Sequence, residues 1–295
     1  MKLRKFKKSI MVALTATMIA GTVLTGCGND GNDGSEISAD SDITVIAREE
    51  GSGTRSAFVE LMGVVDADDK DITVSTAEIT SSTSVMLTTV KDNVAAIGYV
   101  SLGSLSDDVK AVKVDGVEAT AENVKNGSYK VSRPFNIAYK EDKLSDLAKD
   151  FISYIMSNEG QAIIEEKGYI AVGATESYTA SNLEGKVVLA GSTSVAPVMD
   201  KLAEEYMKLN SGVTIEIQQS GSSAGMTSTI EDACDIGMAS RDVKDSEIAE
   251  GLTATKIAVD GIAVIVNKEN TFADDLTSEQ IKGIYLGEIT TWSLK

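Results

Sequence analysis

Apolar residues along this chain gather in short runs that are separated by segments with helical spacing. Runs of β-branched and other apolar residues between turn-forming residues are typical of strands. We expect strands at residues 43–47, 96–100, 109–114, 134–139, 186–190, 213–219 and 256–267. The alternation of strands with helical segments predicts an α/β fold with parallel sheets.

Two segments between these strands carry apolar residues every three or four positions. The first has Leu144, Leu147, Phe151 and Ile155, and the second has Val195, Met199, Leu202, Tyr206 and Leu209. We expect Gly160 to break the first helix before Ile163, and Gly168 suits its C-terminal end. Thr277 and Gln280 have the spacing of a capping box, which predicts a helix that contains Ile281.

The first 26 residues have the pattern of a signal peptide. A positively charged start is followed by the uncharged, apolar stretch 9–24, which is short for a membrane span. The stretch ends in Leu24-Thr25-Gly26-Cys27, which resembles the lipobox of bacterial lipoproteins, where an acyl lipid such as palmitate anchors the cysteine. An uncleaved anchor is the alternative. Residues 27–42 are rich in Gly, Asn, Asp and Ser, which predicts a flexible, lipid-anchored tether.

Composition excludes several classes of protein. The chain has 27 Lys and Arg against 45 Asp and Glu, and this net charge of −18 disfavours nucleic-acid binding. It has no His, which excludes Ser-His-Asp hydrolysis and His-ligated metals. Two Cys cannot form a disulfide framework or a four-cysteine zinc site, and we expect Cys234 to be a buried structural thiol.

One kind of loop occurs three times, at residues 48–55, 191–194 and 221–225. Each is a Gly, Ser and Thr turn that follows an expected strand and opens a helical segment. Such turns present unpaired backbone N–H groups at the positive end of a helix dipole, which favours anions. The alternative is that Ser and Thr serve only as ordinary helix N-caps.

Arg48 stands at the start of the first of these loops. Its alternative role is a surface ion pair with Glu49 or Glu50. Taken with the three loops, it predicts a cage for a small anion. Because distant charges are screened beyond about 8 Å at physiological salt, the acidic chain can still select an anion through local donors.

Eight strings resemble the phosphate-binding proteins of high-affinity phosphate ABC transporters over nearly all of residues 43–295. They are AGSTSVAP (190–197), QQSGSSAG (218–225), CDIGMASR (234–241), IAVDGIAVIVNK (257–268), LTSEQIKGIYLGEITTW (276–292), ITVIAREEGSGTR (43–55), AAIGYVSLG (95–103) and SNEGQAIIEEKGYIAV (157–172). The resemblance implies a two-lobed type II periplasmic-binding-protein-like clamp with a two-strand hinge. It also implies closure on one dehydrated phosphate, which is passed to a membrane permease.

The order of these strings differs from that of the family, in which AGSTSVAP comes first. The resemblance therefore implies a circular permutation. It implies one lobe from residues 131–261 and a split lobe from residues 43–130 plus 262–295. We expect Lys295 to lie near Asp42 and Ile43, because the ends of domains often lie close together.

The resemblance also implies which residues bind the ligand. They are Arg48, Ser52, Gly53, Thr54, Thr193, Ser194, Ser222 and Ser240. Glu50 is expected to hold the Arg48 guanidinium, and Gly51 and Gly221 support the loops.

Ser240 occupies a place where family members carry an Asp that accepts the proton of bound hydrogen phosphate. A Ser can accept as well as donate, so rejection of sulfate stays open. Arg55 and Arg241 either add positive charge near the site or pair with Glu60 and Asp242.

We therefore expect an extracytoplasmic solute-binding lipoprotein that is monomeric, is not an enzyme, and uses no cofactor or metal. Its partners are inorganic phosphate, the permease subunits of an ABC transporter, and the membrane through the lipid on Cys27. The alternatives are the same clamp for sulfate or molybdate, a surface phosphatase, or an adhesin.

Overall fold

A mixed β-sheet is the central feature of the protein, and β11 (Thr253–Asn267) is its longest described strand. The computed structural model describes residues 37–174 and 176–294, so the predicted signal peptide and Cys27 lie outside the described residues. The strand order is β2 (Glu78–Thr80), β1 (Thr44–Arg48), β3 (Ala96–Ser101), β11, β6 (Ser132–Tyr139), β10 (Ile236–Ala239), β8 (Gly185–Gly191) and β9 (Val213–Gln219). Two shorter strands, β4 (Val109–Ala111) and β7 (Ile170–Ala171), also pair with β11.

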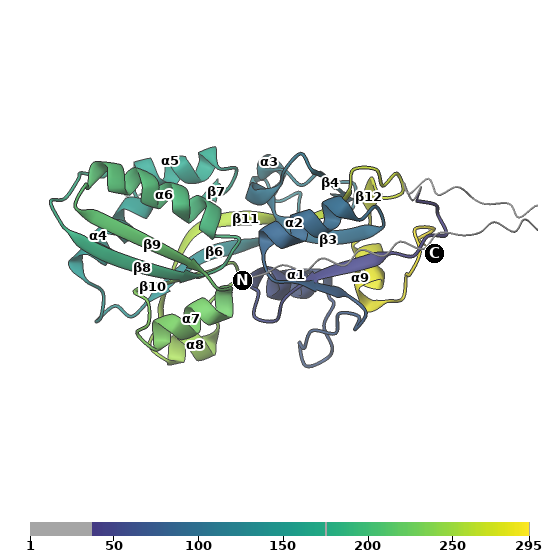
Figure 1. Cartoon of the computed structure of the whole chain (residues 1–295), viewed down its shortest axis with the longest axis horizontal. Helices are drawn as coiled ribbons and strands as arrows, with labels where there is room; N and C mark the ends of the chain where they lie inside the picture. The colour runs from purple at the N-terminus through teal and green to yellow at the C-terminus, as the bar shows by residue number, and fades with distance from the viewer. Residues whose placement is uncertain (1–36, 175, 295) are drawn as a thin grey trace, which may run out of the picture. The chain divides into compact units, whose positions relative to one another are not determined.

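Helices pack on both faces of this sheet. They are α1 (Gly53–Met62), α2 (Thr83–Asp92), α3 (Ala121–Lys125), α4 (Asp146–Ile155), α5 (Asn158–Glu166), α6 (Ala196–Leu209), α7 (Ser222–Ile230), α8 (Asp245–Ala249) and α9 (Ser278–Leu286), with a 3₁₀ turn at Leu102–Ser104. A small second sheet pairs β12 (Asp275–Leu276) with β5 (Lys113–Val114). In Figure 1, α5 and α6 lie on one side of β8 and β9, and α7 and α8 lie on the other.

The expected strands are present, but the sheet is not purely parallel. Strand β1 runs parallel to β2 and β3, and β8 runs parallel to β9 and β10. Every pairing of β11 is antiparallel. The expected strand at 109–114 is divided into β4 and β5, because Lys113 bonds to Asp274 instead of continuing along β11.

The helix predictions hold, with one correction at Gly160. The break lies earlier, at Met156–Ser157, where Ser157 caps α5 and accepts from the Gly160 N–H at 3.1 Å. A Cβ on Gly160 would lie 2.2 Å from the Tyr154 carbonyl oxygen, so glycine is needed there for close packing of α5 on α4. The capping box of Thr277 and Gln280 at the start of α9 is confirmed.

Buried apolar side chains form two large clusters. The first cluster comes mainly from β6, β8, β10 and helices α4 to α6, and includes Phe135, Leu189 and Tyr206. The second cluster comes mainly from α1, α9 and β3, and includes Phe58 and Tyr285.

Strand β11 belongs to both clusters. Its Ile257 and Ala258 pack in the first cluster, and Ile262, Val264 and Val266 pack in the second. Up to Gly261 it pairs with β6, and from Ile262 it pairs with β3. The chain therefore passes between the clusters along two adjacent strands.

The two ends of the described chain lie side by side. The Ile43 N–H donates to the Thr290 carbonyl at 2.8 Å, and the Trp292 N–H donates to the Ser41 carbonyl at 3.2 Å. Trp292 is buried in the second cluster. The expected proximity of the termini is confirmed as far as residue 292, and Lys295 lies outside the described residues.

Candidate functional site

The three loops singled out in the sequence open helices at the ends of β1, β8 and β9. Ser52 caps α1 and accepts from the Arg55 N–H at 3.3 Å. The loop after β9 is held against the loop after β8, because the N–H groups of Ser220 and Gly221 both donate to the Gly191 carbonyl at 2.9 Å. Since the carboxyl ends of parallel strands share one edge, the first turns of α6 and α7 come together.

Hydroxyl groups from these loops converge. Thr54 Oγ1 lies 2.8 Å from Ser194 Oγ and 3.5 Å from Ser240 Oγ. Ser240 Oγ lies 3.4 Å from Ser222 Oγ, which also accepts from the Ser240 N–H at 3.2 Å. All four residues are buried. The structure thus brings these four predicted residues into one cluster, although Thr54 lies more than 100 positions from the others along the chain.

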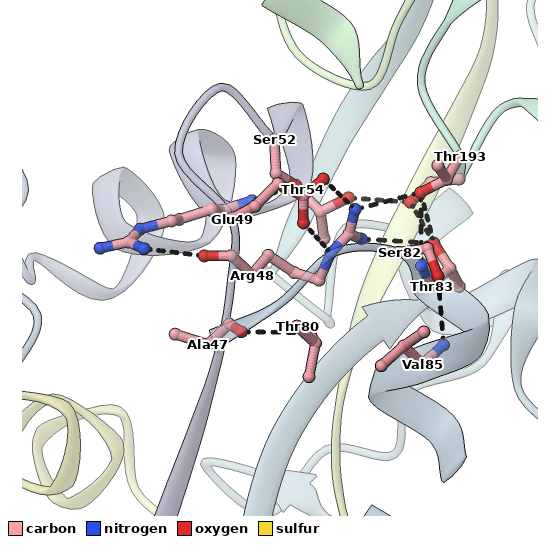
Figure 2. A network of polar contacts seen from close by, with 12 residues as sticks. Ala47, Arg48, Glu49, Ser52, Thr54, Thr80, Ser82, Thr83, Val85 and Thr193 are labelled. Atoms are coloured by element: carbon pink, nitrogen blue, oxygen red, sulfur yellow. Dashed lines mark hydrogen bonds and ion pairs between the residues drawn. The ribbon is translucent and has the colours of Figure 1, made fainter. Parts of the chain in front are cut away.

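Arg48 joins this cluster through a buried guanidinium. Figure 2 shows it between Glu49 on one edge and Thr83 and Thr193 on the other. Its Nε and Nη2 each donate to a Glu49 carboxylate oxygen at 2.7 Å, and Nη2 also donates to Thr193 Oγ1 at 3.1 Å. This bidentate pair fixes both the charge and the plane of the guanidinium.

The expected partner of Arg48 was Glu50, and this prediction is wrong. Glu49 continues the strand pairing, with its N–H donating to the Thr80 carbonyl at 2.9 Å. The chain then turns at Glu50 and Gly51, where Gly51 has φ +84°, and Glu50 is exposed. Glu49, which still belongs to the strand pairing before this turn, therefore holds the guanidinium in place of Glu50.

Two glycines allow the loops to meet. An ideal Cβ on Gly53 would lie 2.4 Å from Ser222 Oγ and 2.8 Å from Ser240 Oγ, so only glycine permits this approach of α1 to α7. The Gly51 carbonyl accepts from the Ser223 N–H at 3.1 Å, which is a direct hydrogen bond between these loops. Gly221, the third predicted glycine, adopts φ +88° immediately before α7.

Thr83, which is buried at the start of α2, was not among the residues predicted from the sequence. Its Oγ1 accepts from Arg48 Nη1 at 3.3 Å and lies 3.2 Å from Thr193 Oγ1 and 3.1 Å from Ser194 Oγ. The signal was the run Thr80-Ser81-Ser82-Thr83, a fourth Ser and Thr turn before a helix. The three-residue strand β2 before it was too short to stand out in the pattern.

A buried ion pair contacts the backbone of Ser240. Arg133 on β6 pairs with Asp260 on β11 at 3.0 Å, and its Nη1 donates to the Ser240 carbonyl at 3.0 Å. Ser101 Oγ donates to the other Asp260 oxygen at 2.9 Å. Burial raises the pKa of the Asp260 carboxyl to about 6, although Arg133 and Ser101 act in the opposite direction. Sequence analysis missed this pair, whose signal was two charges inside otherwise apolar strands.

Arg55 and Arg241 are paired, but not with the predicted acids. Arg55 Nε donates to Asp71 at 2.6 Å, and Arg55 Nη1 donates to the Arg48 carbonyl at 2.7 Å. Burial opposes ionisation of Asp71, but hydrogen bonds from Arg55 and Thr73 hold its pKa below the ordinary value. Arg241 forms a bidentate pair with Glu247, and its Nη2 also donates to Ser223 Oγ at 3.3 Å.

The arrangement provides many donors and one guanidinium for a small anion. Among residues 37–174 and 176–294, no group of three or more Cys, Asp or Glu side chains is placed to hold a metal ion. Within the same part of the chain, no helix is long and apolar enough to cross a membrane. Cys234 is buried, and burial raises the pKa of its thiol, as a structural cysteine requires.

Comparison with known proteins shows the family to which the chain is similar. The family described as PBP superfamily domain matches residues 17–159 and 176–294. The chain is 50% identical over 295 residues to phosphate-binding protein PstS 2 of Streptococcus agalactiae serotype V, with 99% of each chain covered. It is 46% identical over 292 residues to phosphate-binding protein PstS 2 of Streptococcus pneumoniae serotype 4, with 98% of each covered. The crystal structure of a phosphate ABC transporter, phosphate-binding protein from S. pneumoniae TIGR4 has a TM-score of 0.68 and 46% identity, and covers 85% of this chain and 98% of that chain.

Proposed function

This chain belongs to the PBP superfamily and to its phosphate-binding proteins, and from this premise we propose that it captures inorganic phosphate for an ABC transporter. One observation carries the proposal. Arg48 and Thr54 meet Thr193, Ser194 and Ser240 within hydrogen-bonding distance in a buried cluster, so the guanidinium and the hydroxyls face a common point.

The chemistry of the cluster suits a compact, strongly charged anion. A charge-assisted hydrogen bond contributes about 1.5–3 kcal/mol. About five such bonds reach the ~8 kcal/mol of micromolar binding before desolvation is subtracted. Burial strengthens each bond because water no longer competes for the donors. We propose the predicted set Arg48, Ser52, Gly53, Thr54, Thr193, Ser194, Ser222 and Ser240 as the ligand contacts.

We propose that the clamp closes about the strands β6 and β11. The split lobe is 43–130 plus 262–295, and the continuous lobe is 131–261. The passage of β11 from the first apolar cluster at Ile257 and Ala258 to the second at Ile262 supports these boundaries to within a few residues. An anion that touches Arg48 from one lobe and Thr193 from the other stabilises the closed state, because only that state offers both contacts.

We propose that the segment order is a circular permutation of the family's order. The bridge between Asp42 and Thr291 supports this. A circular permutation opens the chain at a new point, and the two new ends then lie next to each other in the fold. The two streptococcal relatives match over 98–99% of their length, so they share this order.

The sequence also bears on where the protein is located and on its oligomeric state. We propose that it acts outside the cytoplasmic membrane, held by an acyl lipid on Cys27, and passes phosphate to permease subunits as a monomer. No catalytic role is proposed for it. The likeness to phosphate-binding proteins supports the extracytoplasmic setting, whereas the lipid and the monomeric state rest on the sequence.

Calorimetric titration of the purified protein with phosphate, sulfate and molybdate tests this function. We expect phosphate to bind at micromolar affinity or tighter, and more tightly than the other two anions. Sulfate binding of equal affinity would indicate a general oxyanion-binding protein rather than a phosphate-specific one. Ser240 bears on this result because it offers a hydroxyl and no carboxylate to the anion. Release of phosphate from a generic phosphate ester would instead indicate an enzyme.

A further inference from the structure

We propose that Thr83 at the start of α2 is a fourth part of the phosphate site, where it positions Thr193 and Arg48. This inference rests on the proposed phosphate binding and extends it to a residue outside the three loops. Thr83 is 5% exposed, and both its N–H and its hydroxyl face the site.

The start of α2 explains how Thr83 reaches the cluster. Ser82 caps the helix in an extended conformation, with φ −160° and ψ 167°, and accepts from the Val85 N–H at 3.2 Å. Thr83 is therefore the first helical residue, whose N–H has no partner within the helix. That N–H donates to Thr193 Oγ1 at 3.3 Å.

Counting hydrogen bonds at Thr193 fixes the direction of its own proton. A hydroxyl can accept two hydrogen bonds and donate one. Thr193 Oγ1 accepts from Arg48 Nη2 at 3.1 Å and from the Thr83 N–H at 3.3 Å. With both acceptor positions used, Thr193 can only donate, and its proton goes either to Thr83 Oγ1 at 3.2 Å or to a phosphate oxygen that enters the site.

Thr83 also completes the surroundings of Arg48. Glu49 holds Nε and Nη2, and Thr83 Oγ1 accepts from Nη1 at 3.3 Å, as Figure 2 shows. The guanidinium is thus fixed at each of its three nitrogens. Thr83 Oγ1 is also 3.1 Å from Ser194 Oγ, so one side chain orders Arg48 and the hydroxyls of Thr193 and Ser194.

Three substitutions distinguish the contribution of the Thr83 hydroxyl from that of its N–H. Thr83→Ser keeps both groups, and Thr83→Val keeps the shape and the N–H but removes the hydroxyl. Thr83→Pro removes both, and the first helical position tolerates proline after an extended residue such as Ser82. Asp146→Pro is the matched control, because Asp146 is the first residue of α4 and follows the extended N-cap Ser145.

The test measures the phosphate dissociation constant by calorimetry and the melting temperature without phosphate. We expect Thr83→Ser and Asp146→Pro to bind within threefold of the parent, Thr83→Val to bind about tenfold more weakly, and Thr83→Pro about a further tenfold more weakly. Parent-like phosphate affinity in Thr83→Ser but not in Thr83→Val, with melting temperatures of these two variants within about 2 °C of each other, would show that the hydroxyl positions the site. A loss of general stability would not give this result.

Three outcomes would overturn the proposal, and each has a different meaning. If the parent binds phosphate and the Ser, Val and Pro variants all bind within threefold of it, Thr83 has no role and the proposed function stands. If the parent itself binds no phosphate, the function and this inference fail together. Equal weakening by Thr83→Ser and Thr83→Val would also refute positioning through the hydroxyl.

Discussion

Arg133 and Asp260 face each other across the neighbouring strands β6 and β11, at the point where the chain passes between the two apolar clusters. Their side chains are 2% and 0% exposed, and their charged atoms lie 3.0 Å apart. Because Arg133 also donates to the Ser240 carbonyl, this ion pair connects the crossing strands to the candidate phosphate site.

Replacement of Asp260 by Asn should lower stability and remove one pH dependence. Asn resembles the carboxyl in size but binds no proton between pH 4 and pH 7, so the variant lacks the part of the stability that comes from the Asp260 proton. Burial raises the pKa of Asp260 from 3.8 to about 6, so the folded protein holds this proton more tightly than the unfolded chain does. The stability that this group contributes is therefore full below pH ~4 and is lost as the pH rises through about 6.

Urea unfolding of the parent and of Asp260→Asn between pH 4 and pH 7 measures both effects. We expect the difference in free energy of unfolding to be largest near pH 4 and to shrink by roughly 1–3 kcal/mol by pH 7. Asp107→Asn, at an exposed position, should track the parent throughout. A constant difference across this range would contradict the assigned titration.

Replacement of Arg48 by Ala should weaken phosphate binding at least about 100-fold, because the charge-assisted bonds from one guanidinium are lost together. Arg48→Lys should give an intermediate affinity, since an ammonium restores the charge but cannot bond to Glu49, Thr83 and Thr193 with the same fork. Calorimetry measures both, with exposed Lys125→Ala as control. Parent-like binding by Arg48→Ala would remove this residue from the site.

Adjacent glutamates offer a matched pair of variants. Glu49→Gln should lower the melting temperature without phosphate, because buried Arg48 loses its bidentate counter-ion at 2.7 Å. Glu50→Gln should leave the melting temperature within about 1 °C, since Glu50 is exposed and surface substitutions usually change stability by less than ~0.5 kcal/mol. Thermal unfolding without ligand distinguishes them. The reverse order would restore the original assignment of Glu50.

Gly53→Ala should weaken phosphate binding by about tenfold or more while leaving a folded protein. The added methyl would meet Ser222 Oγ and Ser240 Oγ at 2.4 and 2.8 Å, so α1 and α7 must separate to accommodate it. Overpacking of this kind typically costs about 1–3 kcal/mol. Calorimetry should show the loss, and circular dichroism should show unchanged helix content. Unchanged affinity would mean that the closed arrangement tolerates the extra volume.

Cys27→Ala should release the protein from the membrane without changing phosphate affinity. The lipobox-like tetrad Leu24-Thr25-Gly26-Cys27 motivates this prediction, and Cys27 is not among the residues proposed to contact phosphate. Fractionation of cells that express the parent or the variant measures the release, and calorimetry on the soluble form measures affinity. Retention of the variant in the membrane fraction would favour an uncleaved anchor.

The sequence predicted strands and helix ends well, because these depend on the backbone and on residues close together in the chain. Strand β9 begins and ends where the apolar alternation predicted, and the capping box at Thr277 forms as expected. Glu49 was considered only as a surface partner of Arg48, and Thr83 was missed, because the role of each residue depends on where a turn directs its side chain. Gly51 at φ +84° settles the first case, and a three-residue strand obscured the second.

By itself, the sequence determined the loops, the helices they open and the supply of donors, because capping and turn formation depend on residues within a few positions of each other. Only the tertiary structure decided which donors share a point, since Thr54 and Ser194 approach to 2.8 Å across 140 positions of chain. Such contacts depend on how β11 and β6 carry the chain between two apolar clusters, and no short-range pattern records that path. The same applies to the charges, because burial rather than residue type raises the pKa of Asp260.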